Sequence, residues 1–230
     1  MTRLIFKYLA IFGLVLYIIL MIPSCGETEK GNEVTTITSN SDIELLSKKS
    51  DTLAFAFENN NIDSFNQLIT SDGLYVISLY GGMGIVETSS KIQLSLLQIK
   101  DGILMTKDDP AVDPPEQELG ITSEAFNSKS TKFSHVSEEG IIENIDWNDM
   151  DYDYLTAHFN DIYFQLVWIC ENSQSENGWI FYKLPNDTYI YSNGHSWFSK
   201  NWNSRVFEGQ SFVLKLIDND YKIVAFINTK

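Results

Sequence analysis

Three histidines, His135, His158 and His195, are the residues of this chain best suited to acid–base or metal chemistry. No two of them have the close spacing with which one helix or strand holds a metal ion. Catalysis or metal binding would therefore require the fold to bring a histidine together with a carboxylate. The chain also lacks the serine, phosphate-loop and paired-cysteine motifs of common enzymes. The sequence predicts no catalytic residue, no metal ligand and no cofactor.

The acidic stretch 146–153 is the second candidate for chemistry. Carboxylates at alternating positions suit calcium, because one loop can then surround a hard cation. A calcium loop would need a glycine at its sixth position and a glutamate at its twelfth, and neither follows Asp146 or Asp149. We interpret the stretch as a solvated acidic turn before a strand, and cation binding stays open.

Aromatic residues are dense between positions 179 and 202. Trp179 and Phe181 would share one face of a strand, and Tyr189 and Tyr191 one face of the next. Such rings can stack on sugars or line an apolar pocket, so the candidate ligand-binding residues are Trp179, Tyr189, Tyr191 and Trp197. The competing interpretation, which we favour, is that these rings fill and border the core of a sheet.

Two helices are predicted ahead of these residues. Ser41 and Glu44 match a capping box at the start of a helix over 42–58, where apolar residues recur with helical spacing. A second helix is expected over 63–70, and a strand over 74–80.

Strand patterns dominate the rest of the chain. A strand over 91–99, for which a helix is the alternative, leads through a turn at 100–102 into a second strand. A long acidic loop over 106–120 is followed by a short helix over 123–128. Asn193-Gly194 predicts a hairpin turn. The later strands are expected at 162–170, 178–184, 187–192, 195–199, 204–217 (broken or bent) and 221–228. Cys170 ends the first of these, and we expect a buried, inert thiol there.

The amino-terminal segment has the pattern of a secretory signal peptide, because Arg3 and Lys7 precede an apolar run over 9–22. An uncleaved membrane span is the alternative, since the apolar stretch 4–22 approaches the roughly 20 residues that a spanning helix needs. The end of the run decides in favour of a signal peptide.

That end, Ile22-Pro23-Ser24-Cys25, resembles the lipobox of bacterial lipoproteins. The resemblance implies cleavage before Cys25 and attachment of diacylglycerol and a further acyl chain such as palmitate to that residue. It also implies a cell-envelope location, and we expect the outer membrane, on either its periplasmic side or its surface. Residues 25–40 would be a flexible tether, and residues 41–230 a single domain.

A net charge of −15 argues against nucleic acid as a partner and against adhesion of the chain as a whole to anionic lipid. Helices first and an antiparallel sheet last give an α+β fold, with two amino-terminal helices on a curved, mostly antiparallel sheet. The helix–helix–strand opening and the closing pair of strands (212–217 and 221–227) resemble an NTF2-like (cystatin-like) domain. That resemblance implies a cone-shaped pocket between the helices and the sheet.

The sequence therefore predicts a lipid-anchored envelope protein whose domain binds a small molecule, a glycan or a protein without catalysis. A hydrolase-like or isomerase-like enzyme that uses such a pocket is one alternative. A structural or assembly component of the envelope, which would present a broad exposed apolar patch, is the other.

Overall fold

A computed structural model describes residues 39–107, 118–122 (backbone), 132–134, 136, 140–171, 178–201 and 203–229. These residues belong to a compact unit that runs from Thr36 to Lys230. The expected signal peptide, Cys25 and nearly all of the tether lie outside the described residues, as do His135, Trp202 and the short helix expected over 123–128. None of the described helices combines the length and the hydropathy that a membrane crossing would need.

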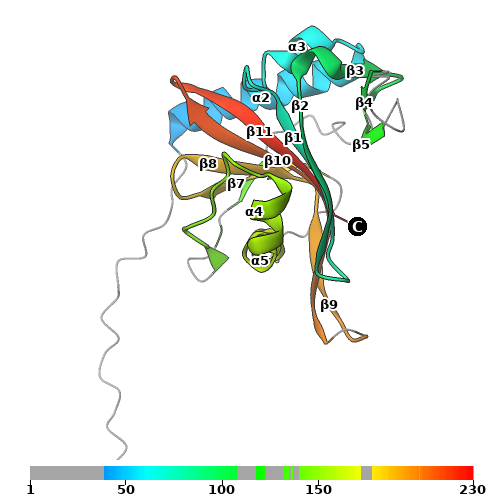
Figure 1. Ribbon diagram of the computed structural model, residues 1–230. Helices are drawn as coiled ribbons and strands as arrows, with labels where there is room; N and C mark the ends of the chain where they lie inside the picture. Colours follow the sequence, from blue (N-terminus) through cyan, green and yellow to red (C-terminus); the bar gives the residue numbers. More distant parts are fainter. Residues whose placement is uncertain are drawn as a thin grey trace, which may run out of the picture. The chain divides into compact units, whose positions relative to one another are not determined.

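The described elements confirm an α+β fold (Figure 1). The helices are α2 (Asn40–Glu58), α3 (Ile62–Asn66), the 3-10 turn η1 (Leu94–Leu96), α4 (Tyr152–Ala157) and α5 (Phe159–Ile169). The strands are β1 (Leu74–Tyr80), β2 (Ile85–Ile92), β3 (Leu97–Lys100), β4 (Ile103–Thr106), β5 (Glu118–Thr122), β6 (Lys132–Ser134), β7 (Ile180–Leu184), β8 (Thr188–Ser192), β9 (His195–Ser199), β10 (Ser204–Ile217) and β11 (Asp220–Thr229).

The main sheet has eight strands in the order β2-β1-β11-β10-β8-β7-β6, and β9 is paired to β10. It is mixed but mostly antiparallel, because β1 with β11 and β6 with β7 are parallel pairs. Strands β3, β4 and β5 form a separate antiparallel sheet.

Helices cover both faces of the main sheet. On one face α2 and α3 pack over Phe212, Ile223 and Phe226, and on the other α4 and α5 pack over Val213 and Ala225. Figure 1 shows the sheet between the two helix pairs. Because side chains on both faces are buried, the central segments 212–214 of β10 and 223–227 of β11 are continuously apolar instead of alternating with polar residues.

The predicted helix over 42–58 is confirmed, but its cap is not the predicted one. α2 begins at Asn40, and Ser39 is the N-cap, whose Oγ accepts a hydrogen bond from the Asp42 amide at 3.1 Å. Ser41 lies inside the first turn, so the predicted cap was two residues too late. The second helix is shorter than predicted and ends at Asn66.

The strand predicted over 162–170 is wrong, because this segment is helix α5. An unbroken apolar run fits a buried helix as well as a buried strand, and eleven residues favour a helix. Phe164 and Trp168, four residues apart, are exposed while most of the helix is buried. Cys170 is the C-cap residue and is only 1% exposed, which confirms the expected burial.

Two further predictions changed between residues 91 and 120. The strand expected over 91–99 is interrupted by η1, because β2 ends at Ile92 and β3 begins at Leu97. The turn at Asp101-Gly102 is confirmed, with φ of 53° and 72°. The loop expected over 106–120 ends earlier than predicted, since β5 begins at Glu118.

Asn193-Gly194 does not form the predicted hairpin turn. β8 and β9 do not pair with each other, and both pair with β10 in one register, through Ser192 with Ser211 and His195 with Glu208. Asn193 joins the two ladders, because its amide donates to the Gln210 carbonyl at 3.1 Å and its Oδ1 accepts from the Gln210 amide at 2.8 Å.

The expected break within 204–217 is not found, because β10 is one continuous strand, with a register shift against β11 between Val213 and Leu214. Gly209 of β10 lies opposite Gly194. Its φ is 144°, and a Cβ there would lie 2.3 Å from the Cα of Gly194. Both glycines are therefore needed, because a side chain at 209 would meet the Gly194 backbone and a Cβ at 194 would lie 2.2 Å from the Phe207 ring.

Candidate functional site

A groove of about 970 Å³ lies against α2, the segment after α3 and the turn between β10 and β11. From α2 it is lined by Leu45, Lys48, Lys49 and Thr52, whose spacing places them on one side of the helix. Leu68, Ile69 and Leu94 add apolar surface. Asn66, Asp72, Asp218, Asp220 and Lys222 add polar and charged groups.

The groove wall after α3 is fixed to β11 by backbone hydrogen bonds. The Ile223 amide donates to the Leu68 carbonyl at 2.7 Å, and the Thr70 amide donates to the Ile223 carbonyl at 3.3 Å. Between β10 and β11, Asp218 and Asn219 have φ of 51° and 63°, as the tight two-residue hairpin turn requires. The side chains of the groove therefore stand on a backbone that is bonded in place.

Most charges in the groove are paired within the chain. Asp220 binds Lys49 at 2.6 Å and Lys222 at 3.0 Å, and Lys222 also donates to the Gln67 carbonyl at 2.7 Å. Burial alone would raise the pKa of Asp220, but the hydrogen bonds from the two lysines lower it below the usual aspartate value. Asp72 is paired with Lys91, whose hydrogen bond is the main cause of its lowered pKa.

Several polar groups of the groove have no partner among the described residues. Lys48 is exposed and makes no ion pair, and Asp218 makes none either. The Oδ1 atom of Asn66 is buried and accepts no hydrogen bond. A buried acceptor without a donor typically costs about 1–3 kcal/mol. The groove thus joins apolar surface to one cation, Lys48, and one anion, Asp218, that make no ion pair with the described residues.

The paired carboxylates of the groove are held in their ionised form. Asp72 and Asp220 have lowered pKa values, so both are ionised at neutral pH and are not poised to donate or accept a proton there. No histidine is among the described residues that line it. The groove offers fixed charges and hydrogen-bonding groups beside an apolar surface.

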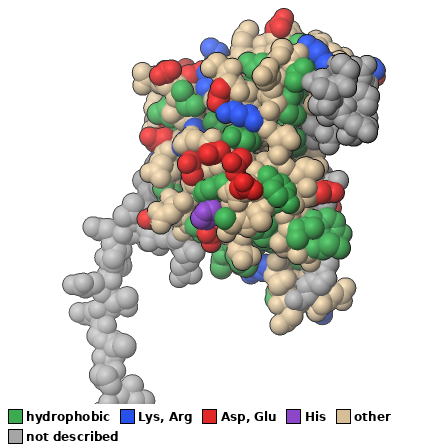
Figure 2. Space-filling model, in the orientation of Figure 1, with side chains coloured by type: hydrophobic (Ala, Val, Ile, Leu, Met, Phe, Trp, Pro, Cys, Tyr) green, Lys and Arg blue, Asp and Glu red, His purple; other side chains and the backbone are tan. Residues whose placement is uncertain are grey.

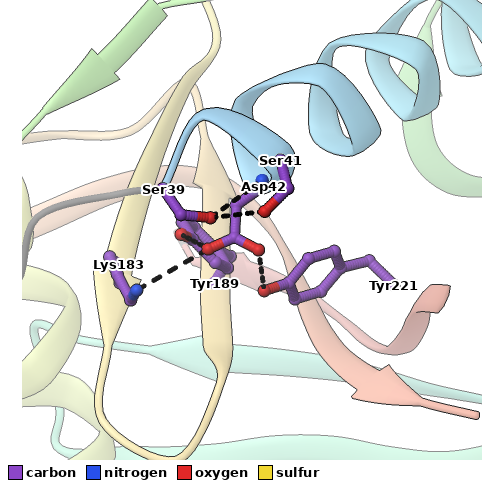
Figure 3. A network of polar contacts seen from close by, with 6 residues as sticks. All are labelled: Ser39, Ser41, Asp42, Lys183, Tyr189 and Tyr221. Atoms are coloured by element: carbon purple, nitrogen blue, oxygen red, sulfur yellow. Dashed lines mark hydrogen bonds and ion pairs between the residues drawn. The ribbon is translucent and has the colours of Figure 1, made fainter. Parts of the chain in front are cut away.

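A second polar cluster lies at the amino-terminal end of α2 (Figure 3). The Asp42 carboxylate accepts hydrogen bonds from Tyr221 at 3.1 Å and from Tyr189 at 3.3 Å, and it lies 3.7 Å from Lys183. The Oγ atoms of Ser39 and Ser41 lie 2.8 Å apart beside it. Asp42 therefore links the first turn of α2 to β7, β8 and β11.

The ionisation states in the Asp42 cluster suit a structural role, and we call this cluster the Asp42 clamp. Burial tends to raise the pKa of Asp42, but hydrogen bonds from Ser39 and Tyr221 and the charge of Lys183 lower it below its usual value. Burial and the neighbouring Asp42 charge raise the pKa of Tyr221. Tyr221 therefore stays a neutral donor and Asp42 an ionised acceptor, so neither is set up for proton transfer near neutral pH.

The four aromatic residues predicted to bind a ligand do not form one surface. Trp179, Tyr189 and Tyr191 are at most 3% exposed and lie in the core beneath α2 and α3. Tyr191 lies 5.0 Å from Trp179, and its hydroxyl is 2.8 Å from the Ser50 Oγ. Trp197 is 39% exposed and lies apart on β9. The favoured interpretation, rings filling a sheet core, agrees with the first three; their ligand-binding role stays a prediction.

The two described histidines are not brought together in a catalytic arrangement. His158 joins α4 to α5, packs against Tyr154 and lies 3.7 Å from Asp161. His195 lies on β9, where it stacks on Trp197 at 4.9 Å. Among the described residues no three histidine, cysteine or acidic side chains are grouped as a metal site would require.

The acidic stretch 146–153 forms turns, but it precedes a helix and not the predicted strand. Asp151 is the N-cap of α4 and accepts from the Tyr154 amide at 2.7 Å, and Asp149 accepts from the Tyr75 hydroxyl at 3.0 Å. Burial and then the bond to Asp149 raise the pKa of Tyr75 to about 12. Figure 2 shows acidic side chains gathered near α4. Here one carboxylate caps a helix and another accepts a hydrogen bond from strand β1.

The groove residues were missed at the level of sequence because they share no motif. Lys49 and Asp220 meet only because α2 packs beside the β10–β11 turn. One signal was present: Leu45, Lys48, Lys49 and Thr52 place charges on a helix face that also carries an apolar residue.

Comparisons of the chain with protein-family models, with curated proteins and with solved structures found no match.

Proposed function

We propose that this chain is a lipid-anchored cell-envelope protein whose domain binds a ligand in the groove beside α2 and does not catalyse a reaction. The observation that carries the binding role is the groove itself, in which Lys48 and Asp218 border apolar side chains without an ion-pair partner among the described residues. The ligand that fits is an amphipathic small molecule or peptide with an anionic group for Lys48 and a donor for Asp218.

Attachment through Cys25 is supported by the lipobox-like sequence at 22–25. Acyl chains contribute about 0.8 kcal/mol per buried methylene, and more than one chain is needed for stable attachment. Several acyl chains on Cys25 would hold the protein at the envelope, with the outer membrane as the proposed location.

Intact-protein mass spectrometry of the membrane fraction tests this attachment. Wild-type chain should begin at Cys25 and carry added acyl mass, and Cys25→Ala should lose both features. An unprocessed chain without lipid that stays in the membrane would instead identify residues 4–22 as a membrane span.

The NTF2-like cone remains part of the proposal. It is supported by the order helix, helix, strand at the start of the domain and by the closing β10–β11 hairpin. An experimental structure with ligand bound between α2 and the main sheet would support the cone, and one with ligand elsewhere would argue against it.

Cysteine protection provides a direct test of the groove. Thr52 lines the groove and Thr156 lies on α4, and each donates its hydroxyl hydrogen bond to the carbonyl four residues earlier. Thr52→Cys, at a half-buried position, and Thr156→Cys, at an exposed one, are each compared with their own rate of thiol modification without ligand. Cys170 adds little background, because it is 1% exposed.

A peptide and small-molecule fraction extracted from the envelope should slow modification at position 52 and leave position 156 unchanged. The protected sample, once released, gives the ligand mass. If the extract left the modification rate at position 52 unchanged, as at position 156, the support for a groove ligand would be removed.

The enzyme alternative requires an acid–base pair in a pocket, and the groove brings no described histidine to its carboxylates. The assembly alternative requires an exposed apolar surface. The exposed aromatic residues of β9 are candidates for such a surface, but we propose below that they contact lipid and not protein.

A further inference from the structure

The first part of β10 and all of β9 form a two-stranded arm, which we define by its described residues, 195–201 and 203–208. Within it His195–Ser199 pair with Ser204–Glu208, whereas β11 pairs with β10 only from Gly209 onward. The arm therefore continues past the end of the central β10–β11 pair, and Figure 1 shows it projecting away from the sheet.

The base of the arm is fixed to helix α5. The Phe207 amide donates to the Tyr163 hydroxyl at 2.8 Å in a buried contact. Arg205 forms an ion pair with Glu171 and lies over the Trp168 ring at 6.0 Å. These contacts hold the arm beside α5 as far out as Arg205, the residue opposite Phe198.

The outer part of the arm exposes an aromatic ring on each face. Trp197 is 39% exposed and Phe198 is 56% exposed. Trp197 is opposite Val206 and Phe198 is opposite Arg205, and neighbouring residues of a strand point to opposite faces. A protein partner docked on one face would leave the other ring in water, whereas a lipid interface surrounds a ribbon on both faces.

The charge of the arm is opposite in sign to that of the chain. The arm carries Lys200, Arg205 and Glu208, a net charge of +1, while the chain as a whole carries −15. Arg205 is paired with Glu171, so Lys200 is the cation of the arm that makes no ion pair with the described residues. Tryptophan favours the headgroup region of a bilayer, and lysine and arginine are attracted to its anionic lipids. The arm is thus suited to a surface that the rest of the protein would avoid.

We propose that the outer part of the arm inserts into the headgroup region of a phospholipid bilayer and gives the protein a second membrane contact. The inference rests on the membrane attachment in the proposed function. Insertion stops at the headgroups, because among the described strands the outer edge of β9 and the 204–208 edge of β10 have no partner. Unpaired backbone groups are excluded from hydrocarbon.

An environment-sensitive fluorophore on the full chain tests this contact. Phe198→Cys and Phe55→Cys carry the same nitrobenzoxadiazole label, since Phe55 is 50% exposed and lies on α2. The labelled chains are purified from the envelope and reconstituted into protein-free phosphatidylethanolamine–phosphatidylglycerol vesicles. The label at 198 should shift its emission to the blue and be quenched severalfold more by shallow spin-labelled lipid than the label at 55.

Vesicle flotation separates this inference from the membrane attachment on which it rests. Protein that floats with the vesicles while both labels give the same polar emission would overturn the arm contact and leave the attachment intact. Failure to float would overturn the attachment. Shielding of position 198 only in native membranes, and not in protein-free vesicles, would overturn the lipid contact in favour of a protein partner.

A charge-reversed variant sharpens the result. Lys200→Glu, combined with the label at 198, should reduce the quenching, because it removes attraction to anionic headgroups at the tip of the arm. Lys132→Glu on the exposed edge strand β6 makes the same change in net charge and should leave the quenching unchanged. Equal loss in both variants would overturn a local role for the arm.

Discussion

The surfaces at the two ends of strand β10 differ in chemistry: one has paired charges and the other has exposed aromatic rings. At its carboxyl end, beside the groove, Asp220 is bonded to Lys49 and Lys222, so most charge is neutralised within the chain. At its amino end, on the arm, Trp197 and Phe198 expose apolar rings. Paired charges fix the side chains that line a groove for a soluble ligand. Exposed rings are removed from water only when they contact another apolar surface.

Between these ends the aromatic residues of the sheet have a third role, which is to fill the core. Trp179 and Trp197 have the same side chain, and 18 residues of sequence separate them, yet one is 0% exposed and the other 39%. The contrast shows that residue type did not decide their role; the position of each strand relative to the helices did.

The largest predicted effect tests this contrast between core and arm. Trp179→Ala should lower the free energy of unfolding by about 3–5 kcal/mol, because it leaves a cavity in the buried core. Trp197→Ala should lower it by less than about 1 kcal/mol, since an exposed ring has little packing to lose. Urea denaturation measures both values, and similar losses in the two variants would contradict the assigned burial.

Gly209 lies where β10 passes from its pairing with β9 in the arm to its pairing with β11 in the sheet. Gly209→Ala should cost about 3 kcal/mol, since its Cβ would lie 2.3 Å from the Cα of Gly194 in a backbone conformation with φ of 144°. Gly84→Ala is the matched control, because its φ is 65° but the nearest atom to a Cβ is 3.8 Å away. It should cost only about 1 kcal/mol. Thermal unfolding compares the two variants. Equal losses of stability would show that the close approach of Gly194 does not restrict the residue at position 209.

The Asp42 clamp should make stability depend on pH. Its folded-state pKa lies below the usual 3.8, so its contribution is present above that value and is lost as pH falls through the lower, folded-state pKa. Asp42→Asn should cost about 1–3 kcal/mol at neutral pH and flatten the acid limb of stability. Asp51→Asn, exposed on the same helix, is the control. An unchanged acid limb in Asp42→Asn would argue against the clamp.

The smallest effect concerns the ion pairs of the groove. Lys222→Gln should cost about 0.5–1 kcal/mol, because the pair with Asp220 is partly exposed and its side chains are 28% and 35% accessible. The loss should shrink in high salt, which screens exposed charges. Lys132→Gln, on β6, should be neutral. A cost that does not respond to salt would indicate a packing role for the Lys222 side chain.

Local patterns in the sequence predicted several elements well. β1, β9 and β10 have the predicted bounds, and the turn at Asp101-Gly102 follows from residues that tolerate positive φ. Helix α2 follows from the spacing of its apolar residues. In each case the information lies within a few neighbouring residues, where local geometry and side-chain spacing act.

The errors have a different physical origin. The segment now known as α5 is apolar almost throughout, so its periodicity does not distinguish a helix from a buried strand. Asn193-Gly194 has the composition of a hairpin turn, but the long strand β10 offers one continuous partner to both β8 and β9. Ser39 and Ser41 are equivalent as caps by type, and contacts of Asp42 with the sheet accompany the earlier start.

By itself, then, the sequence determined the α+β class, the limits of most strands and the lipobox-like segment that motivates attachment at Cys25. Only the tertiary structure decided which aromatic rings are buried, where charges pair and which residues form the groove and the arm. Lys49 meets Asp220, and Asp42 meets Tyr221, across most of the length of the domain. Such contacts depend on how helices pack on both faces of the sheet, and no local pattern of residues contains that information.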